Sequence, residues 1–278
     1  MSRAGGGRLL ALSLLVLLCC LSSCHGAKNR NRMYSLASRM SRQIFLMSSS
    51  AVYGYEYLQH AEKDMIEYFR KNNVYRVLFI PYALKNHEAY TEKVGSVLRR
   101  WGFECEGIHR KPNPVQAINE AQAIYIGGGN TFLLLKTLYD NNLIEPIRER
   151  VMNHHIPYIG SSAGTNVATR SIQTTNDMPI IYPPSFDGLR LVPFNINPHY
   201  LDPEEGGKHK GETREERISQ FHELNDAPVL GLREGCTMVV DGEKATLIGS
   251  YGARLFRKGR EPEELKIGAD VSFLLEGN

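Results

Sequence analysis

Residues 156–168 read IPYIGSSAGTNVA, a short apolar run that passes through a Gly-x-Ser-x-Gly motif into small residues compatible with a helix. This order predicts a strand, a sharp turn at Ser162 and a helix start, the arrangement of a nucleophile elbow. Gly160 and Gly164 would let the strand and the helix pass closely. The first N–H groups of the helix would offer positive potential to an oxyanion. An ordinary strand–helix turn also fits this stretch when it is taken alone.

Strands and helices alternate around this stretch through residues 43–170. Short apolar runs predict strands at 43–47, 74–80, 103–108, 123–126 and 157–160. Amphipathic or capped stretches predict helices at 55–71, 90–101, 114–121, 131–139 and 144–154. We therefore expect an α/β fold, a three-layer sandwich with a mainly parallel sheet. Ligands bind beyond the carboxyl ends of such strands, where both Ser162 and the run Gly127-Gly128-Gly129 fall.

The second half of the chain is less regular. Residues 171–188 form a long loop, and a loop of this length inside a compact domain is usually functional. A strand-like run at 189–196 and a helix at 214–224 follow, and an apolar strand is predicted at 229–232. Short antiparallel strands are predicted near the C-terminus, at 237–240, 245–248, 253–256 and 271–275.

Composition and charge are those of an ordinary globular protein of 278 residues. The net charge is +3, from 33 basic and 30 acidic residues, and it indicates neither a nucleic-acid partner nor an anionic membrane. Cys105 and Cys236 are far apart in the sequence and have no zinc-site spacing. We expect both to be free thiols rather than one disulfide.

The N-terminal residues predict a targeting segment. Residues 1–26 have a basic start and an apolar run too short to span a membrane, as in a secretory signal peptide. Residues 27–42 are a basic linker, and residues 43–278 are expected to form one α/β hydrolytic domain. A product that starts at Met33 or Met40 would lack the signal.

A serine nucleophile needs a general base and an orienting acid. His199 is the best-placed histidine because it follows a strand-like run and Asn197-Pro198, although a turn histidine would look the same. Glu234 lies just past the strand at 229–232, and Asp177 in the long loop competes with it. The glycine run could give an oxyanion donor or a phosphate-binding turn, but neither phosphate-binding fingerprint is present.

Six stretches match sequence motifs of one family, and they occur in the same order as in that family: residues 126–132, 158–164, 174–179, 196–199, 209–215 and 231–235. Residues 43–257 thus resemble peptidase E, the α-aspartyl dipeptidases, which are serine peptidases on a class I glutamine amidotransferase-like scaffold. The resemblance implies a triad of Ser162, His199 and Glu234, and so favours Glu234 over Asp177. It implies hydrolysis of dipeptides with an N-terminal aspartate through an acyl-enzyme, without a metal or cofactor.

The resemblance also implies the groups around the triad. The oxyanion would be bound by Gly128, Gly129 and Ala163, and the aspartyl carboxylate by Arg214. Asp177 and Asn176 would line the pocket or help to bind the substrate amine. In the alternative without a binding role, Arg214 is an exposed arginine at the start of a helix. Asn176 and Asp177 then make only the hydrogen bonds that are usual in turns.

Two features depart from the family. Ser161 stands where we expect tryptophan in bacterial members, which would change the pocket wall. The family is typically cytoplasmic, whereas the apparent signal indicates secretion of this form. We expect a small peptide substrate, no nucleic acid and no stable membrane association after signal removal. The sequence leaves open whether the chain forms a homodimer. The alternatives are a cyanophycinase-like β-aspartyl peptidase and a non-catalytic binding protein, while an amidotransferase would normally carry cysteine at position 162.

Overall fold

The computed structural model describes residues 42–203 and 211–277. The predicted signal peptide at 1–26 and all but the last residue of the predicted linker lie outside these residues. None of the helices within the described ranges is long and apolar enough to cross a membrane.

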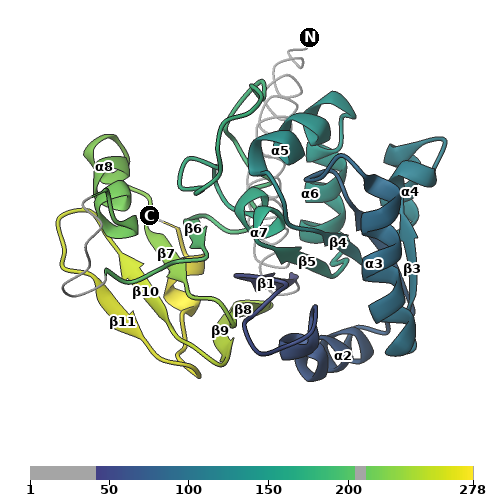
Figure 1. Ribbon diagram of the computed structural model, residues 1–278, viewed down its shortest axis with the longest axis horizontal. Coiled ribbons are helices and arrows are strands. Elements are labelled where there is room, and N and C mark those ends of the chain that lie inside the picture. Colours follow the sequence, from purple (N-terminus) through teal and green to yellow (C-terminus); the bar gives the residue numbers. More distant parts are fainter. Residues whose placement is uncertain (1–41, 204–210, 278) are drawn as a thin grey trace, which may run out of the picture. The chain divides into compact units, whose positions relative to one another are not determined.

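A seven-stranded sheet forms the centre of the fold, in the order β3-β2-β4-β5-β1-β8-β9 (Figure 1). Its first five strands pair in parallel, and β8 and β9 add antiparallel strands at one edge. The parallel strands are β1 (Gln43–Met47), β2 (Arg76–Ile80), β3 (Glu104–Gly107), β4 (Ile124–Ile126) and β5 (Tyr158–Ser161). The antiparallel strands are β8 (Cys236–Asp241) and β9 (Lys244–Gly249). The predicted fold class is therefore confirmed.

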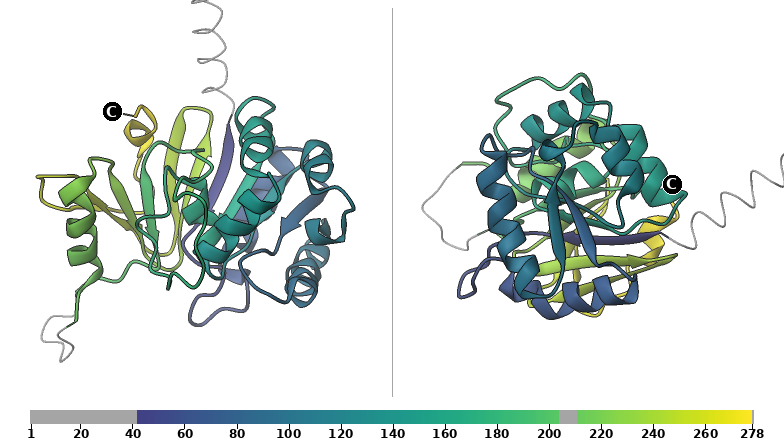
Figure 2. Two further views of the ribbon diagram at one scale, coloured as in Figure 1. Left: turned by 90° about the horizontal axis from the view of Figure 1, so that it is seen from above. Right: turned by 90° about the vertical axis from the view of Figure 1, so that its right-hand side faces the viewer.

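Helices cover both faces of this sheet, as the two views in Figure 2 show. Alternate residues of β1 enter separate hydrophobic clusters: Phe45 packs on the side of α2 and α3, and Ile44 on the side of α4 to α7. The helices are α2 (Glu62–Lys71), α3 (His87–Arg100), α4 (Pro114–Glu120), α5 (Thr131–Asp140), α6 (Ile144–Met152) and α7 (Ala163–Ala168). Three-residue 3-10 turns lie at Gln59–Ala61 and Ile108–Arg110.

A second, four-stranded sheet was not predicted from the sequence. Its order is β11-β10-β7-β6, and only β6 and β7 pair in parallel. The strands are β6 (Asn195–Pro198), β7 (Val229–Leu232), β10 (Ala253–Phe256) and β11 (Glu263–Leu265). Helix α8 (Arg214–Leu224) packs on it through Ile218, which lies in one cluster with Val229 and Phe256. Parallel pairing brings the carboxyl ends of β6 and β7 together.

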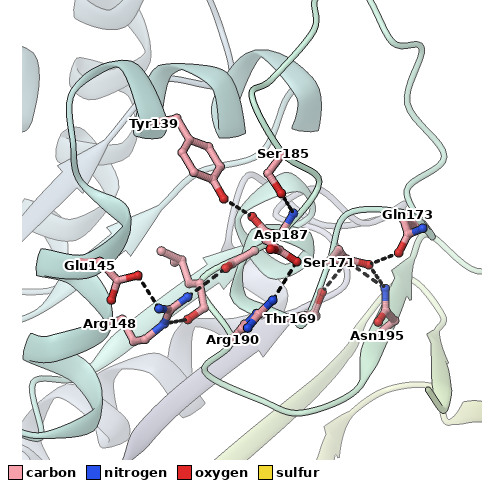
Figure 3. Close-up of polar contacts among 12 residues, drawn as sticks. Tyr139, Glu145, Arg148, Thr169, Ser171, Gln173, Ser185, Asp187, Arg190 and Asn195 are labelled. Carbon is pink, nitrogen blue, oxygen red and sulfur yellow. Dashed lines mark hydrogen bonds and ion pairs between the residues drawn. The ribbon is translucent and has the colours of Figure 1, made fainter. Parts of the chain in front are cut away.

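The strand predicted at 189–196 is wrong except for its last two residues. Leu189, Arg190 and Leu191 instead donate their N–H groups to the carbonyls of residues 167–169 at the end of α7. Helix ends leave such carbonyls without intrahelical partners, so this apolar stretch caps a helix rather than joining a sheet. Figure 3 shows the side chains that tie this segment down, with Arg148 bonded to the Leu189 carbonyl and Tyr139 to the Asp187 carbonyl.

The strand predicted at 271–275 is also wrong. Residues Ser272–Leu275 form a 3-10 helix, because the Asp270 carboxylate accepts the Ser272 N–H and holds a turn there.

The packing of α7 against the sheet gives a stability prediction. A methyl group on Gly164 would lie 2.0 Å from the Ile126 carbonyl oxygen, which is backbone that cannot move aside cheaply. We expect Gly164→Ala to lower the free energy of unfolding by about 3 kcal/mol in urea titrations, near the upper end of ordinary overpacking.

Gly95→Ala is the matched control, because its added methyl group meets only the flexible Arg99 guanidinium. It should change the free energy of unfolding by less than about 1 kcal/mol. Equal urea midpoints for the two variants would show that the close approach at Gly164 is not needed.

Candidate active site

Ser162 lies at the sharp turn that the sequence predicts, between β5 and α7. Its φ of 52° and ψ of −108° are unfavourable for a residue with a side chain. The Ser162 N–H bonds to the Met47 carbonyl at 3.2 Å, and this contact with β1 helps to hold the strained turn. The hydroxyl is thereby presented at the carboxyl edge of the parallel strands.

His199 and Glu234 meet Ser162 in one hydrogen-bonded line. His199 Nε2 lies 2.8 Å from Ser162 Oγ, and His199 Nδ1 lies 2.6 Å from Glu234 Oε1. A carboxylate accepts hydrogen bonds, so Nδ1 carries the proton and Nε2 is left to accept the serine proton. The structure thus brings together the three residues that the sequence nominated, from two different sheets.

Ser48 links these two sheets, and sequence reasoning missed it. Its hydroxyl accepts the His199 N–H at 2.9 Å and donates to the Leu232 carbonyl at 2.8 Å. His199 has a φ of 53°, so its backbone needs such support. The only sequence signal was the run of small polar residues after the first strand.

Asn176 and Asp177 make positioning contacts rather than lining the cavity beside Ser162. The Asn176 amide donates to the Pro198 carbonyl at 2.7 Å and accepts from the Asn197 amide at 2.9 Å, which fixes the end of β6. The Asp177 carboxylate accepts the Thr131 N–H at 2.7 Å and caps α5. Both contacts support the segments that carry the site.

Arg214 begins α8 and is half-buried, and it does not line that cavity either. Burial lowers the pKa of its guanidinium, Arg217 acts in the same direction, and Asp177 opposes them. An arginine remains charged under such shifts. Arg214 is therefore a half-buried cation at the start of α8 that is influenced by the Asp177 carboxylate.

A cavity of about 510 Å³ opens beside Ser162. Its volume lies within the usual range for small-molecule sites. Its walls come from the loop after β1, from α3, and from the glycine run. The lining residues are Ser49, Ser50, Ala51, Tyr57, Leu84, Asn86, Ala89, Tyr90, Lys93, Gly128, Gly129, Ser162 and His199.

The glycine run presents one open N–H group beside this cavity. Gly127 N–H bonds to the Ile80 carbonyl at 3.3 Å, and Gly128 N–H bonds to the Tyr90 hydroxyl at 2.8 Å. Gly129 N–H has no acceptor within residues 42–203 and 211–277. Gly129 has a φ of +135°, and a Cβ there would lie 2.4 Å from the Ala83 carbonyl oxygen. Only glycine fits this position.

The geometry therefore favours Gly129 and Ala163 as oxyanion donors, since Ala163 carries the first N–H of α7. Gly128 already has an acceptor in the Tyr90 hydroxyl, which holds the peptide in place. Burial raises the pKa of Tyr90, so this hydroxyl stays neutral. No sequence pattern distinguished Tyr90 from any other helix residue.

Ser161 is fully buried and is absent from the residues that line the cavity. Its hydroxyl accepts from the Tyr125 hydroxyl at 3.4 Å. Any influence of Ser161 on the site must therefore pass through buried neighbours such as Tyr125, not through the wall itself.

Comparisons with known proteins agree on one family. A family model described as Peptidase family S51 matches residues 44–248. A Drosophila melanogaster protein named "Probable alpha-aspartyl dipeptidase" is 56% identical over 236 residues, which cover 85% of this chain and 98% of the fly protein. A Streptomyces coelicolor protein named peptidase E is 49% identical over 233 residues, which cover 84% and 95% of the two chains.

The fold also resembles a solved structure. A peptidase from an acI-B1 Actinobacterium matches with a TM-score of 0.61 at 20% identity, covering 85% of this chain and 98% of that one. At this identity the likeness supports the shared fold only.

The hydrogen-bonded line predicts how the site reacts with a fluorophosphonate serine reagent. We expect the reagent to label Ser162 in the wild-type protein and to leave Ser162→Ala unlabelled, as peptide mass spectrometry would show. Ser48→Ala should slow labelling about 5- to 10-fold, because the His199 backbone loses one hydrogen bond.

Ser96→Ala, an exposed change on α3, is the control and should label at the wild-type rate. Labelling that is equally fast in Ser48→Ala would contradict the supporting role of Ser48.

Proposed function

The chain belongs to peptidase family S51, and from this membership we propose that Ser162, His199 and Glu234 form the catalytic triad of an aspartyl dipeptidase. The observation that carries the proposal is the line of two hydrogen bonds, 2.8 Å and 2.6 Å long, that joins the three side chains. The chain is a serine peptidase, and its substrates are dipeptides with an N-terminal aspartate.

The first half of the reaction forms an acyl-enzyme. Ser162 Oγ attacks the aspartyl carbonyl carbon while its proton passes to His199 Nε2, and Glu234 stabilises the resulting imidazolium. The carbonyl oxygen becomes an oxyanion that receives the N–H groups of Gly129 and Ala163. The C–N bond then breaks, His199 gives its proton to the leaving nitrogen, and the second amino acid departs.

The second half releases aspartate. A water molecule gives a proton to His199 Nε2 and attacks the ester carbonyl, and the bond to Ser162 Oγ breaks as the serine regains that proton. Every proton in the cycle is carried by His199. The chain's own residues account for each step, and the cycle is redox-neutral.

Arg214 is the proposed partner of the aspartyl side chain. A guanidinium grips a carboxylate with two parallel hydrogen bonds, which suits selection of aspartate over neutral residues.

The competing function on this scaffold is hydrolysis of β-linked aspartyl substrates, as in cyanophycinase-like enzymes. The name of the Drosophila relative, "Probable alpha-aspartyl dipeptidase", favours the α-linkage. A non-catalytic binding protein would not need the strained Ser162 backbone, which costs about 1–3 kcal/mol.

We propose the cytoplasm as the compartment of the working form. Cys105 and Cys236 are both free thiols, as predicted, which fits a reducing environment. Fractionation of cells that express the full chain tests this, since a secreted form would appear in the medium shortened at its N-terminus. Sedimentation of the same protein decides whether it is a monomer or a homodimer.

A dipeptide panel tests the proposed activity. We expect the wild type to hydrolyse Asp-Leu at least about 100-fold faster than Asn-Leu, because Asn-Leu leaves the half-buried Arg214 guanidinium unpaired. The β-linked isomer should also be cleaved more slowly, because its scissile carbonyl is displaced relative to its free carboxylate. Ser162→Ala should lose at least about 10⁴-fold in kcat on Asp-Leu. Full activity of Ser162→Ala, or faster cleavage of the β-linked isomer, would contradict the proposal.

Tyr90→Phe tests the oxyanion loop. Without the hydroxyl, Gly128 N–H loses its acceptor and the peptide that presents Gly129 N–H is held less firmly. We expect kcat on Asp-Leu to fall about 10-fold while KM stays within about twofold, since the oxyanion forms only after Ser162 attacks and is absent from the bound substrate.

The control is Tyr125→Phe, whose hydroxyl faces Ser161 instead of the glycine run. It should keep nearly the wild-type kcat. A Tyr90→Phe enzyme with unchanged kcat, or with only a raised KM, would show that Tyr90 serves binding or packing alone.

A further inference from the structure

Lys93 is the one lysine or arginine among the residues that line the cavity beside Ser162. It lies on α3, and its ammonium sits 4.1 Å from the centre of the Tyr57 ring. A cation over an aromatic face is held in place while its charge stays available. None of the cavity-lining residues carries a carboxylate. The cavity therefore offers a positive group to an anion.

Within the described residues, Lys93 has no ion pair and its ammonium has no hydrogen-bond acceptor. Other lysines in that part of the chain are unpaired too, but none of them lines this cavity: Lys63, Lys85, Lys244 and Lys266. Lysines such as Lys71, Lys111 and Lys136 are paired with Asp241, Glu106 and Asp140. An unpaired ammonium in a cavity with the candidate nucleophile is thus open to a carboxylate from outside the chain.

The position of the leaving group determines which carboxylate of the substrate can reach Lys93. His199 must hand its proton to the leaving nitrogen, so the second amino acid of the dipeptide lies on the His199 side of Ser162. His199 and Lys93 line the same cavity. In a dipeptide, the terminal carboxylate is attached to the carbon next to that nitrogen. It therefore lies within a few bonds of the group that His199 protonates.

The other cation approaches from elsewhere. Arg214 begins α8, which packs on the second sheet through Ile218, whereas Lys93 lies on α3 against the central sheet. Figure 1 shows α8 beside the second sheet and α3 across the molecule, with α7 between them. Two cations on two sides of Ser162 match a substrate that carries a carboxylate at each end.

We infer that Lys93 binds the free C-terminal carboxylate of the substrate and so limits the enzyme to dipeptides. The inference rests on the proposed function and adds a residue that determines specificity. A longer peptide or a C-terminal amide has no carboxylate at this position, and it would leave the ammonium unpaired in the complex.

The test pairs a change in the enzyme with a change in the substrate. Wild-type enzyme and Lys93→Met are compared on Asp-Leu and on its C-terminal amide, Asp-leucinamide. We expect Lys93→Met to lower kcat/KM for Asp-Leu about 10- to 100-fold, mostly through KM, as for the loss of a charged hydrogen bond. The value for Asp-leucinamide should change by less than about threefold. Lys93→Arg should restore part of the preference for the free acid.

Lys63→Met is the matched control, because it removes one exposed positive charge from the neighbouring helix α2 without touching the cavity. It should leave the ratio of the two substrates unchanged, which separates local binding from long-range attraction. Thermal unfolding of Lys93→Met should match that of the wild type.

Equal losses on the acid and the amide would overturn the inference and give Lys93 a structural role. A changed ratio of Asp-Leu to Asn-Leu, with the acid-to-amide ratio unchanged, would also overturn it, because Lys93 would then read the aspartyl side chain. Failure of the proposed function looks different: the wild type itself would cleave neither Asp-Leu nor its amide.

Discussion

The 2.8 Å hydrogen bond between His199 Nε2 and Ser162 Oγ joins side chains carried by two separate sheets, so the site requires these sheets to keep a fixed spacing. Ser162 directly follows β5 of the central sheet, whereas His199 and Glu234 follow β6 and β7 of the smaller one. A shift of one sheet against the other by about 1 Å would break proton transfer. The Ser48 hydroxyl limits such a shift, because it bonds to both the His199 N–H and the Leu232 carbonyl.

Strain and close packing are placed where the chemistry needs them. Ser162 and His199 both have positive φ values, which L-residues adopt at a cost. Backbone contacts stabilise these conformations: Ser162 N–H bonds to β1, and the Pro198 carbonyl before His199 accepts the Asn176 amide. The long loop that carries Asn176 is thus part of the support for the base. This use explains why so long a loop is fixed by Arg148 and Tyr139.

Local patterns in the sequence predicted the parallel strands of the central sheet and nominated Ser162 and His199, because each lies directly after an apolar run. They left Glu234 and Asp177 as competing acids, and only the family resemblance favoured Glu234. The second sheet was not predicted, because its strands are short and its pairing joins segments far apart in the chain. Ser48 and Tyr90 were missed for a related reason. Ser48 meets His199 across 151 positions, and no local spacing records a contact of that kind. Residues 189–194 misled the prediction, since burial against a helix end looks like burial in a strand.

The covalent intermediate offers the most direct test of the account. The measurement is mass spectrometry of the enzyme, quenched with acid within milliseconds of mixing with Asp-Leu. The account predicts an aspartyl ester on the peptide that contains Ser162, formed in the wild type and absent from Ser162→Ala. Rapid hydrolysis of Asp-Leu by Ser162→Ala, or an aspartyl adduct on any other residue, would contradict it.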